Sequence, residues 1–271
     1  MKASHDPSRQ AALELLTTVR VDDAYSNVVW PGILRRRDLS GRDAAFATEL
    51  AYGTLRWQGF YDHVLASCSS RSWSTVDPVI ADVLRLCCHQ LLTMRVPDHA
   101  AVDSSAELLK SVGIADQGRV GFVNAVARSV AQRTFEQWRD ETLLHCCGDV
   151  GLALTTSHPQ WIVESLRASL AKHDGLTLSA EALNRALLAN NTPARPTVRL
   201  RHGLTKDSDQ RLAPGMWLKS AAVVESGMPG DLQLIRSRQA IVQDEGSQLA
   251  VEALVRAHVD GPEASWLDMC A

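Results

Sequence analysis

The segment Leu84–Pro97, LRLCCHQLLTMRVP, decides the fold class of the first half of this 271-residue chain. It belongs to a pattern of apolar residues at helical spacing that covers about 78–94 and ends close to a proline. Similar patterns, separated by short polar turns, cover about 7–19, 24–37, 40–57, 59–68, 99–112 and 118–134. Because no alternating strand pattern appears before about residue 195, we expect an all-α domain of roughly 130 residues.

Two of these helices have recognisable start signals. Asp6 followed by Pro7 combines a side chain that can accept hydrogen bonds from the first turn with a proline suited to the first helical position. Ser40 followed by Asp43 has the spacing of a capping box, in which side chains and backbone N–H groups bond reciprocally. We therefore expect helices to begin at Pro7 and just after Ser40.

Three segments of this helical half resemble the NusB-like RNA-binding domain. They are Ala51–Trp57 (AYGTLRW), Leu84–Asp103 (with LRLCCHQLL and HAAVD) and Gly121–Arg128 (GFVNAVAR). His89 stands where that family usually has an aromatic residue, and Asp103 stands where it usually has a glutamate. The resemblance covers most of residues 7–133 and implies a helical bundle that binds RNA.

The second half of the chain mixes the two kinds of pattern. Helical patterns around Trp161 and from Ser179 onward are followed by PTVRLR at Pro196–Arg201, which alternates like a strand. Gly, Pro and Ser residues then leave room only for short strands, around 216–225 and 240–242. We expect a NusB-like domain at 5–135, a helical and α/β linker subdomain at 136–238, and a third domain at 239–271.

The third domain carries two motifs in order. Val242–Gln248 reads VQDEGSQ and begins a helical pattern, and Leu267–Ala271 reads LDMCA after Trp266. Together they resemble the beginning of the catalytic domain of the RsmB (Sun/Fmu) type of 16S ribosomal RNA cytosine-C5 methyltransferases. In that family a VQDxxSQ helix precedes an LDxCAAPGGKT strand, whose glycines hold S-adenosylmethionine. The resemblance implies a mainly α chain that ends in the first elements of a Rossmann-like methyltransferase domain.

The same resemblance implies what the site residues do. Cys270 and Ala271 would lie at the S-adenosylmethionine site, and the catalytic cysteines are expected beyond Ala271, so no residue of this chain is assigned a catalytic role. We therefore expect the chain to be truncated at the start of the cofactor motif and inactive by itself. Asp244 and Gln248 are expected to brace the cofactor site rather than to react.

Arginines are the candidate RNA contacts, although the formal net charge of the chain is −3. Any RNA site must therefore come from local clustering of positive charge. Arginine forks suit phosphate oxygens, and the candidates are Arg9, Arg35, Arg36, Arg37, Arg42, Arg199 and Arg201. A solvated turn, partly neutralised by Asp38 and Asp43, remains the alternative for the cluster at residues 35–42. Trp30, Trp57 and Trp73 are interpreted as core residues rather than base-stacking platforms.

The six cysteines show no metal-binding spacing, since the adjacent pairs at 87–88 and 146–147 point in different directions on a helix. We expect no metal site.

The chain has no apolar run of the roughly 18 residues that a membrane span requires. Its N-terminus has no apolar signal region, so we expect a cytoplasmic protein.

Two other functions remain open from the sequence. A non-enzymatic NusB-type antitermination factor would account for residues 7–133 but leave 140–271 without a role. A methyltransferase acting on protein or on a small molecule would account for the C-terminal motifs. The RsmB-type resemblance favours 16S ribosomal RNA as the partner and S-adenosylmethionine as the cofactor.

Overall fold

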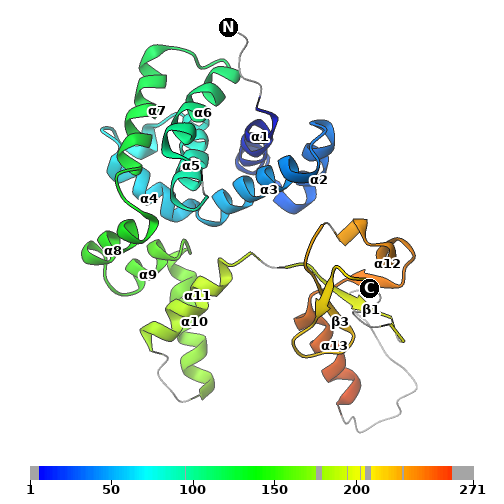
Figure 1. Cartoon of the computed structure of the whole chain (residues 1–271). Coiled ribbons are helices and arrows are strands. Elements are labelled where there is room, and N and C mark those ends of the chain that lie inside the picture. The colour runs from blue at the N-terminus through cyan, green and yellow to red at the C-terminus, as the bar shows by residue number, and fades with distance from the viewer. Residues whose placement is uncertain are drawn as a thin grey trace. The chain divides into compact units, whose positions relative to one another are not determined.

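The computed structural model describes residues 6–94, 96–174, 179–193, 195–201, 203–204, 209–227 and 229–257, with backbone only for 170–174 (Figure 1). The packing of the chain divides it into two compact units, Met1–Thr192 and Pro193–Ala271. The first unit is helical in its described residues, and the second contains a small sheet. The predicted mainly α class, with a helical N-terminal domain, is confirmed.

The bundle of the first unit is built around α5 (Pro78–Leu92), which contains the segment Leu84–Leu92. The surrounding elements are α1 (Pro7–Asp22), α2 (Ser26–Arg36), α3 (Gly41–Arg56), α4 (Gln58–Cys68), η1 (Trp73–Thr75), α6 (Asp98–Ser111) and α7 (Gln117–Val130). Helix α5 packs against α1, α3, α4, α6 and α7. Apolar residues from almost every turn of α5 are buried, which places this helix at the centre of the core.

Both helices begin where predicted, but only one of the two predicted capping interactions forms. At α1, the Asp6 carboxylate accepts a hydrogen bond from the N–H of Arg9 at 3.0 Å, and Pro7 occupies the first helical position, as predicted. At α3, Ser40 is the N-cap residue but its side chain makes no capping bond, so the predicted capping box is wrong. The next residue, Gly41, has φ +54°, a left-handed backbone at the first position of the helix.

Four further helices belong to the first unit: α8 (Phe135–His145), α9 (Gly148–Thr155), α10 (Gln160–Asp174) and α11 (Ala180–Asn190). Helix α9 packs against both α4 and α8. The ring of Phe135 meets Trp57 at 4.9 Å and Phe60 at 5.2 Å between centroids, which anchors α8 on the bundle. The predicted segment 136–238 therefore spans both compact units, and the three-domain division stays a prediction.

The second unit contains a four-stranded antiparallel sheet in the order β2-β3-β1-β4. Its elements are β1 (Thr197–Leu200), β2 (Leu212–Pro214), β3 (Ala221–Val224), η3 (Pro229–Asp231), α12 (Gln233–Arg236), β4 (Ala240–Val242) and α13 (Glu245–Arg256). Strands β1 and β4 match the predicted ranges. The strand predicted at 216–225 is shorter, because residues 215–220 form the loop between β2 and β3.

The two faces of this sheet differ in burial. Val198, Leu200, Ala222 and Val224 point into a small apolar core that also contains Leu232 and Leu234 near α12. The opposite face carries Arg199, whose cross-strand partners are Ala221 and Ile241. Helix α13 contacts β1, and Figure 1 shows α12 and α13 on different sides of the strands. The predicted strand at Trp266–Ala271 lies outside the described residues, so the Rossmann-like domain stays a prediction.

Candidate nucleic-acid interface

Glu14 of α1 determines which arginines of the 35–42 cluster have free side chains. Its Oε1 accepts a hydrogen bond from Nη2 of Arg36, and its Oε2 accepts one from Nε of Arg37, both at 2.7 Å. Nη1 of Arg37 also donates to Oε1 of Gln10 at 3.0 Å. Partial burial raises the pKa of the Glu14 carboxyl, but the two guanidinium contacts outweigh burial, so its pKa lies below the ordinary value. Glu14 is therefore a carboxylate that holds two of the four arginines.

Arg35 and Arg42 form the free part of the same cluster. Both side chains are exposed, at the end of α2 and the start of α3. Neither has an ion-pair or hydrogen-bond partner for its guanidinium among the residues that the structure describes. The α2–α3 turn thus presents two unengaged guanidinium groups together with two that are already bound to Glu14.

Arg9 lies in a different environment. Its guanidinium bonds to the Asp6 carboxylate, donates from Nε to Oε1 of Gln90 at 2.8 Å, and stacks 5.0 Å from the ring centre of Phe46. The side chain is only 15% exposed. These contacts join the start of α1 to α3 and α5, so the geometry gives Arg9 a structural task besides any contact with RNA.

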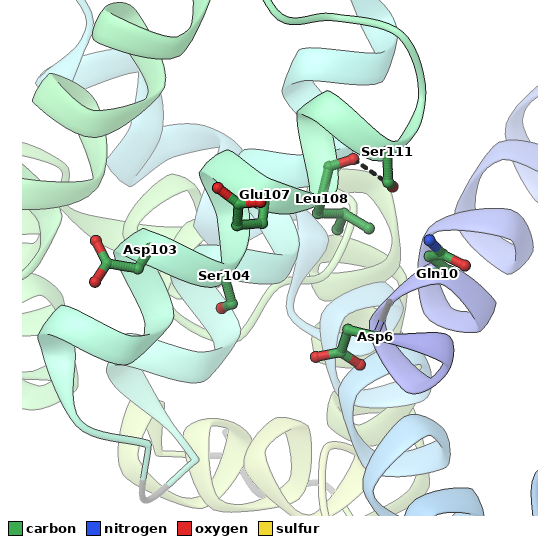
Figure 2. Close-up of a pocket in the computed structure, with 7 residues that line it drawn as sticks. All are labelled: Asp6, Gln10, Asp103, Ser104, Glu107, Leu108 and Ser111. Atoms are coloured by element: carbon green, nitrogen blue, oxygen red, sulfur yellow. Dashed lines mark hydrogen bonds between the residues drawn. The ribbon is translucent and has the colours of Figure 1, made fainter. Parts of the chain in front are cut away.

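The side of the bundle next to Asp6 is acidic. A cavity of about 220 Å³ is lined by Asp6 and Gln10 and, on α6, by Asp103, Ser104 and Glu107; Figure 2 shows these residues. Asp6 is paired with Arg9, and Glu107 lies 2.7 Å from Nζ of Lys110, so Asp103 is the one carboxylate of this cavity without a cation partner among the described residues.

Arg199 and Arg201 belong to the second compact unit, whereas the 35–42 cluster belongs to the first. Both side chains are exposed, and neither has a side-chain partner among the described residues. Arg199 lies within β1, and Arg201 follows its last residue, with its backbone N–H donating to the carbonyl of Gln239 at 3.0 Å. RNA contact by all seven predicted arginines stays a prediction.

Sequence reasoning missed the role of Glu245. Its carboxylate, in the first turn of α13, accepts hydrogen bonds from the backbone N–H of Met216, Trp217 and Leu218 at 2.9, 2.7 and 2.8 Å. Burial raises the pKa of Glu245, but these three hydrogen bonds outweigh burial and hold it below its ordinary value. The sequence contains no local signal for this contact, because the partners are almost thirty residues apart.

The other residues of the VQDEGSQ motif have structural contacts. Asp244 caps α13 by accepting the N–H of Gly246 at 2.9 Å. Gln248 is buried and donates from Nε2 to the carbonyl of Gln243 at 3.0 Å. The role of Asp244 and Gln248 in bracing a cofactor site stays a prediction. The predicted cofactor residues Cys270 and Ala271 lie outside the described residues.

Two cysteines, Cys87 and Cys88, are buried in α5. Burial raises the pKa of Cys87 to about 11 and also raises that of Cys88. Within the described part of the chain, no three His, Cys, Asp or Glu side chains gather in a way that could hold a metal ion. Likewise, none of the described helices has the length and apolar character needed to cross a membrane.

Comparison with known proteins finds sequence similarity along both halves of the chain. Residues 6–132 match the NusB family. The chain is 41% identical over 269 residues to "Putative methyltransferase Rv1407" of Mycobacterium tuberculosis, covering 98% of this chain and 58% of that protein. It is 26% identical over 259 residues to "Probable ribosomal RNA small subunit methyltransferase B" of Bacillus subtilis, covering 91% and 54% respectively. The chain thus spans little more than half the length of these relatives.

A solved structure shares the fold. The crystal structure of PH0851 superimposes with a TM-score of 0.61 at 12% sequence identity, over 92% of this chain and 55% of that one. Since identity is this low, the match speaks for the fold alone. Residues 6–132 thus match the NusB family, and nearly the whole chain is similar to a protein named putative methyltransferase and, at lower identity, to one named probable ribosomal RNA small subunit methyltransferase B.

Proposed function

We propose that this chain is the RNA-recognition part of an S-adenosylmethionine-dependent 16S ribosomal RNA cytosine-C5 methyltransferase. The single observation that carries the proposal is the pair of unengaged guanidinium groups, Arg35 and Arg42, on the surface of a NusB domain. Cations free of carboxylate partners gain most from phosphate, since they give up no existing ion pair. The relatives named ribosomal RNA small subunit methyltransferase B suggest the substrate class.

The similarity to the relatives favours a methyltransferase over an antitermination factor. It extends over almost the whole chain and so includes the sheet and α13, which a NusB domain alone does not explain. In the proposed enzyme the NusB domain binds the RNA, and the catalytic domain supplies the methyl donor and the cysteine nucleophile. The cytosine C5 specificity and the S-adenosylmethionine site at Cys270 and Ala271 are parts of this proposal.

The exposure and ion pairing of each arginine suggest which role it has in RNA binding. Arg35 and Arg42 are proposed to contact phosphates directly. Arg36 is 65% exposed although it is bound to Glu14, so its remaining N–H groups can still reach a phosphate. Arg37 and Arg9 are more enclosed and are proposed to position α1 and the turn. Arg199 and Arg201 are proposed to contact RNA separately, from the second unit.

The experiment is a titration of 16S ribosomal RNA fragments with the chain, followed by fluorescence anisotropy at several salt concentrations. The double variant Arg35→Gln/Arg42→Gln is expected to bind more weakly, and its log K against log salt slope should fall by about 1 to 2. Glu14→Gln should bind more tightly, because it removes a negative charge and releases Arg36 and Arg37.

The matched control is Arg119→Gln/Arg185→Gln, which removes the same charge from exposed arginines that pair with Asp116 and Glu181 on other helices. If this control weakens binding as much as Arg35→Gln/Arg42→Gln does, only total charge matters and the turn is not the site. Absence of any measurable RNA binding by the unsubstituted chain would contradict the proposed function itself.

A further inference from the structure

The loop between β2 and β3 is held in one conformation by a buried acceptor. Glu245, with only 7% of its surface exposed, accepts hydrogen bonds from the N–H groups of Met216, Trp217 and Leu218. Gly215 admits this close approach, since a Cβ there would lie 2.7 Å from Oε1 of Glu245 and 2.6 Å from the Cβ of Ala221. The buried carboxylate therefore holds the backbone of residues 215–218 in place.

The exposed side chains of Met216 and Trp217 in this loop are apolar. Trp217 is 63% exposed and Met216 is 79% exposed, whereas Trp30 is buried and Trp57 and Trp73 pack partly buried against the core of the bundle. A large exposed aromatic side chain contributes little to folding and is available for contact with a partner. A rigid loop also loses little conformational freedom when a partner binds.

Positive charges lie on the loops at the end of the sheet that carries Trp217. Three loops meet at the same end of the antiparallel sheet: the one after β1, the one before β3 and the one before β4. They carry Arg201, Lys219 and Arg238, all exposed. Backbone bonds hold these loops together, from the N–H of Leu200 to the carbonyl of Ser220 at 2.7 Å and from the N–H of Arg201 to the carbonyl of Gln239 at 3.0 Å.

These three cations differ from Arg211 and Arg256 of the second unit in having no ion pair with any residue that the structure describes. Arg211 and Arg256 lie 2.7 and 2.6 Å from the carboxylates of Asp209 and Glu252. By contrast, Arg201, Lys219 and Arg238 have no ion-pair partner among the described residues. One end of the sheet therefore combines an exposed indole with three unengaged positive charges.

We infer that this end of the sheet binds an unpaired RNA strand, with the indole of Trp217 stacking on a base and Arg201, Lys219 and Arg238 contacting its phosphates. Every base has a flat face that stacks on an aromatic ring, and cations beside such a ring follow the backbone of a single strand. A base inside a duplex offers no free face, so the surface distinguishes unpaired from paired RNA. The inference rests on the proposed function, because it names the form of RNA that the second unit takes.

The test compares binding of a short single-stranded RNA and of the corresponding duplex by the unsubstituted chain and by Trp217→Ala. The matched control is Trp161→Ala, since Trp161 is 66% exposed but lies on α10 of the first unit. We expect Trp217→Ala to lose roughly 5- to 150-fold in affinity for the single strand and little for the duplex, the range that one stacked base supports. Trp217→Phe should retain most of the affinity, and Trp161→Ala should change neither.

The outcomes separate this inference from the proposed function. If Trp217→Ala binds the single strand as well as Trp161→Ala does, while Arg35→Gln/Arg42→Gln still weakens RNA binding, the inference is wrong and the function stands; the loop then serves a partner other than RNA. Equal losses for single strand and duplex would also overturn it. If the unsubstituted chain binds neither RNA, the proposed function fails first.

Discussion

A Cβ atom on Gly53 would lie 2.1 Å from Nε2 of His89, so this glycine of α3 and this histidine of α5 fit together as a pair. The imidazole is held in place, because its Nδ1 lies 2.8 Å from the hydroxyl of Tyr61 and 2.7 Å from that of Thr93. His89 and Tyr61 are both buried. The ring therefore has little freedom to move away from α3.

This contact predicts that Gly53→Ala destabilises the bundle. In an unconstrained helix interior, the change from glycine to alanine stabilises by about 1 kcal/mol. Here the added methyl group overlaps a fixed ring, and overpacking of this kind costs roughly 1–3 kcal/mol. We expect a net decrease in the free energy of unfolding, measured by urea titration with far-UV circular dichroism.

The control for Gly53→Ala is the same substitution in a His89→Ala background. The imidazole is then absent, and Gly53→Ala should be neutral or stabilising. A double-mutant cycle from the four proteins gives the coupling between the two positions. An equal loss of stability in both backgrounds would show that the His89 ring is not the cause.

Arg85 predicts a second stability effect, through the buried carboxylate of Asp82. The Asp82 side chain is 2% exposed and accepts hydrogen bonds from Arg85 at 2.8 Å and from Arg20 at 2.9 Å. Arg85 also bonds to both carboxylate oxygens of Asp62. Arg85→Met would leave a buried negative charge with one partner, so we expect a loss of about 3–5 kcal/mol in the free energy of unfolding.

Two comparisons check the Arg85 prediction by urea titration. Arg185→Met breaks an exposed pair with Glu181 and should change stability by less than about 0.5 kcal/mol. Adding Asp82→Leu to Arg85→Met removes the buried carboxylate that has lost one of its two partners and should restore part of the loss. A double variant that is no more stable than Arg85→Met would contradict the electrostatic explanation.

The features that could be predicted from the sequence are local ones. The Asp6–Pro7 start of α1 and the apolar spacing of α5 depend on residues within a few turns, and both predictions are confirmed. The capping box at Ser40 is also a local prediction, but it fails, and the left-handed backbone of Gly41 beside it is a detail that the pattern does not reveal. Helix positions thus followed from the pattern, and the detail of one turn did not.

The features that could not be predicted depend on residues that meet only in the folded chain. Glu14 and Arg37 are 23 residues apart, and their ion pair decides which arginines remain free. Glu245 and Trp217 are 28 residues apart, and their hydrogen bond fixes the loop that carries the exposed indole. Counting arginines therefore located a basic cluster but could not tell engaged side chains from unengaged ones, and it overlooked Lys219 and Trp217.

The cysteines predict a clear order of chemical reactivity. Cys147 is exposed, whereas Cys87 and Cys88 are buried. Burial raises the pKa of Cys87 to about 11, so at pH 8 roughly one thiol in a thousand is the reactive thiolate. In the native protein iodoacetamide should modify Cys147 well before Cys87 and Cys88, as mapped by peptide mass spectrometry. Early modification of either buried thiol would contradict the burial described for α5.

The hydrogen bonds of Glu245 predict that the order of the 215–218 loop depends on pH. The pKa of Glu245 is lowered in the folded chain from a value of 4.5 for a free carboxyl. The stabilisation is therefore fully present above about pH 4.5 and is lost as the pH falls through the lower, folded pKa, because the protonated carboxyl accepts N–H bonds poorly. Hydrogen-exchange protection of the amides of Met216, Trp217 and Leu218 should decrease in that range.

Two references identify Glu245 as the titrating group in this exchange measurement. In Glu245→Gln the three amides should be less protected at pH 7 and should show no further step as the pH falls. The amide of Leu200, which donates to the carbonyl of Ser220 at 2.7 Å, involves no carboxylate and should stay protected throughout. If the Leu200 amide loses protection together with the other three, the sheet as a whole is opening and the carboxylate is not the cause.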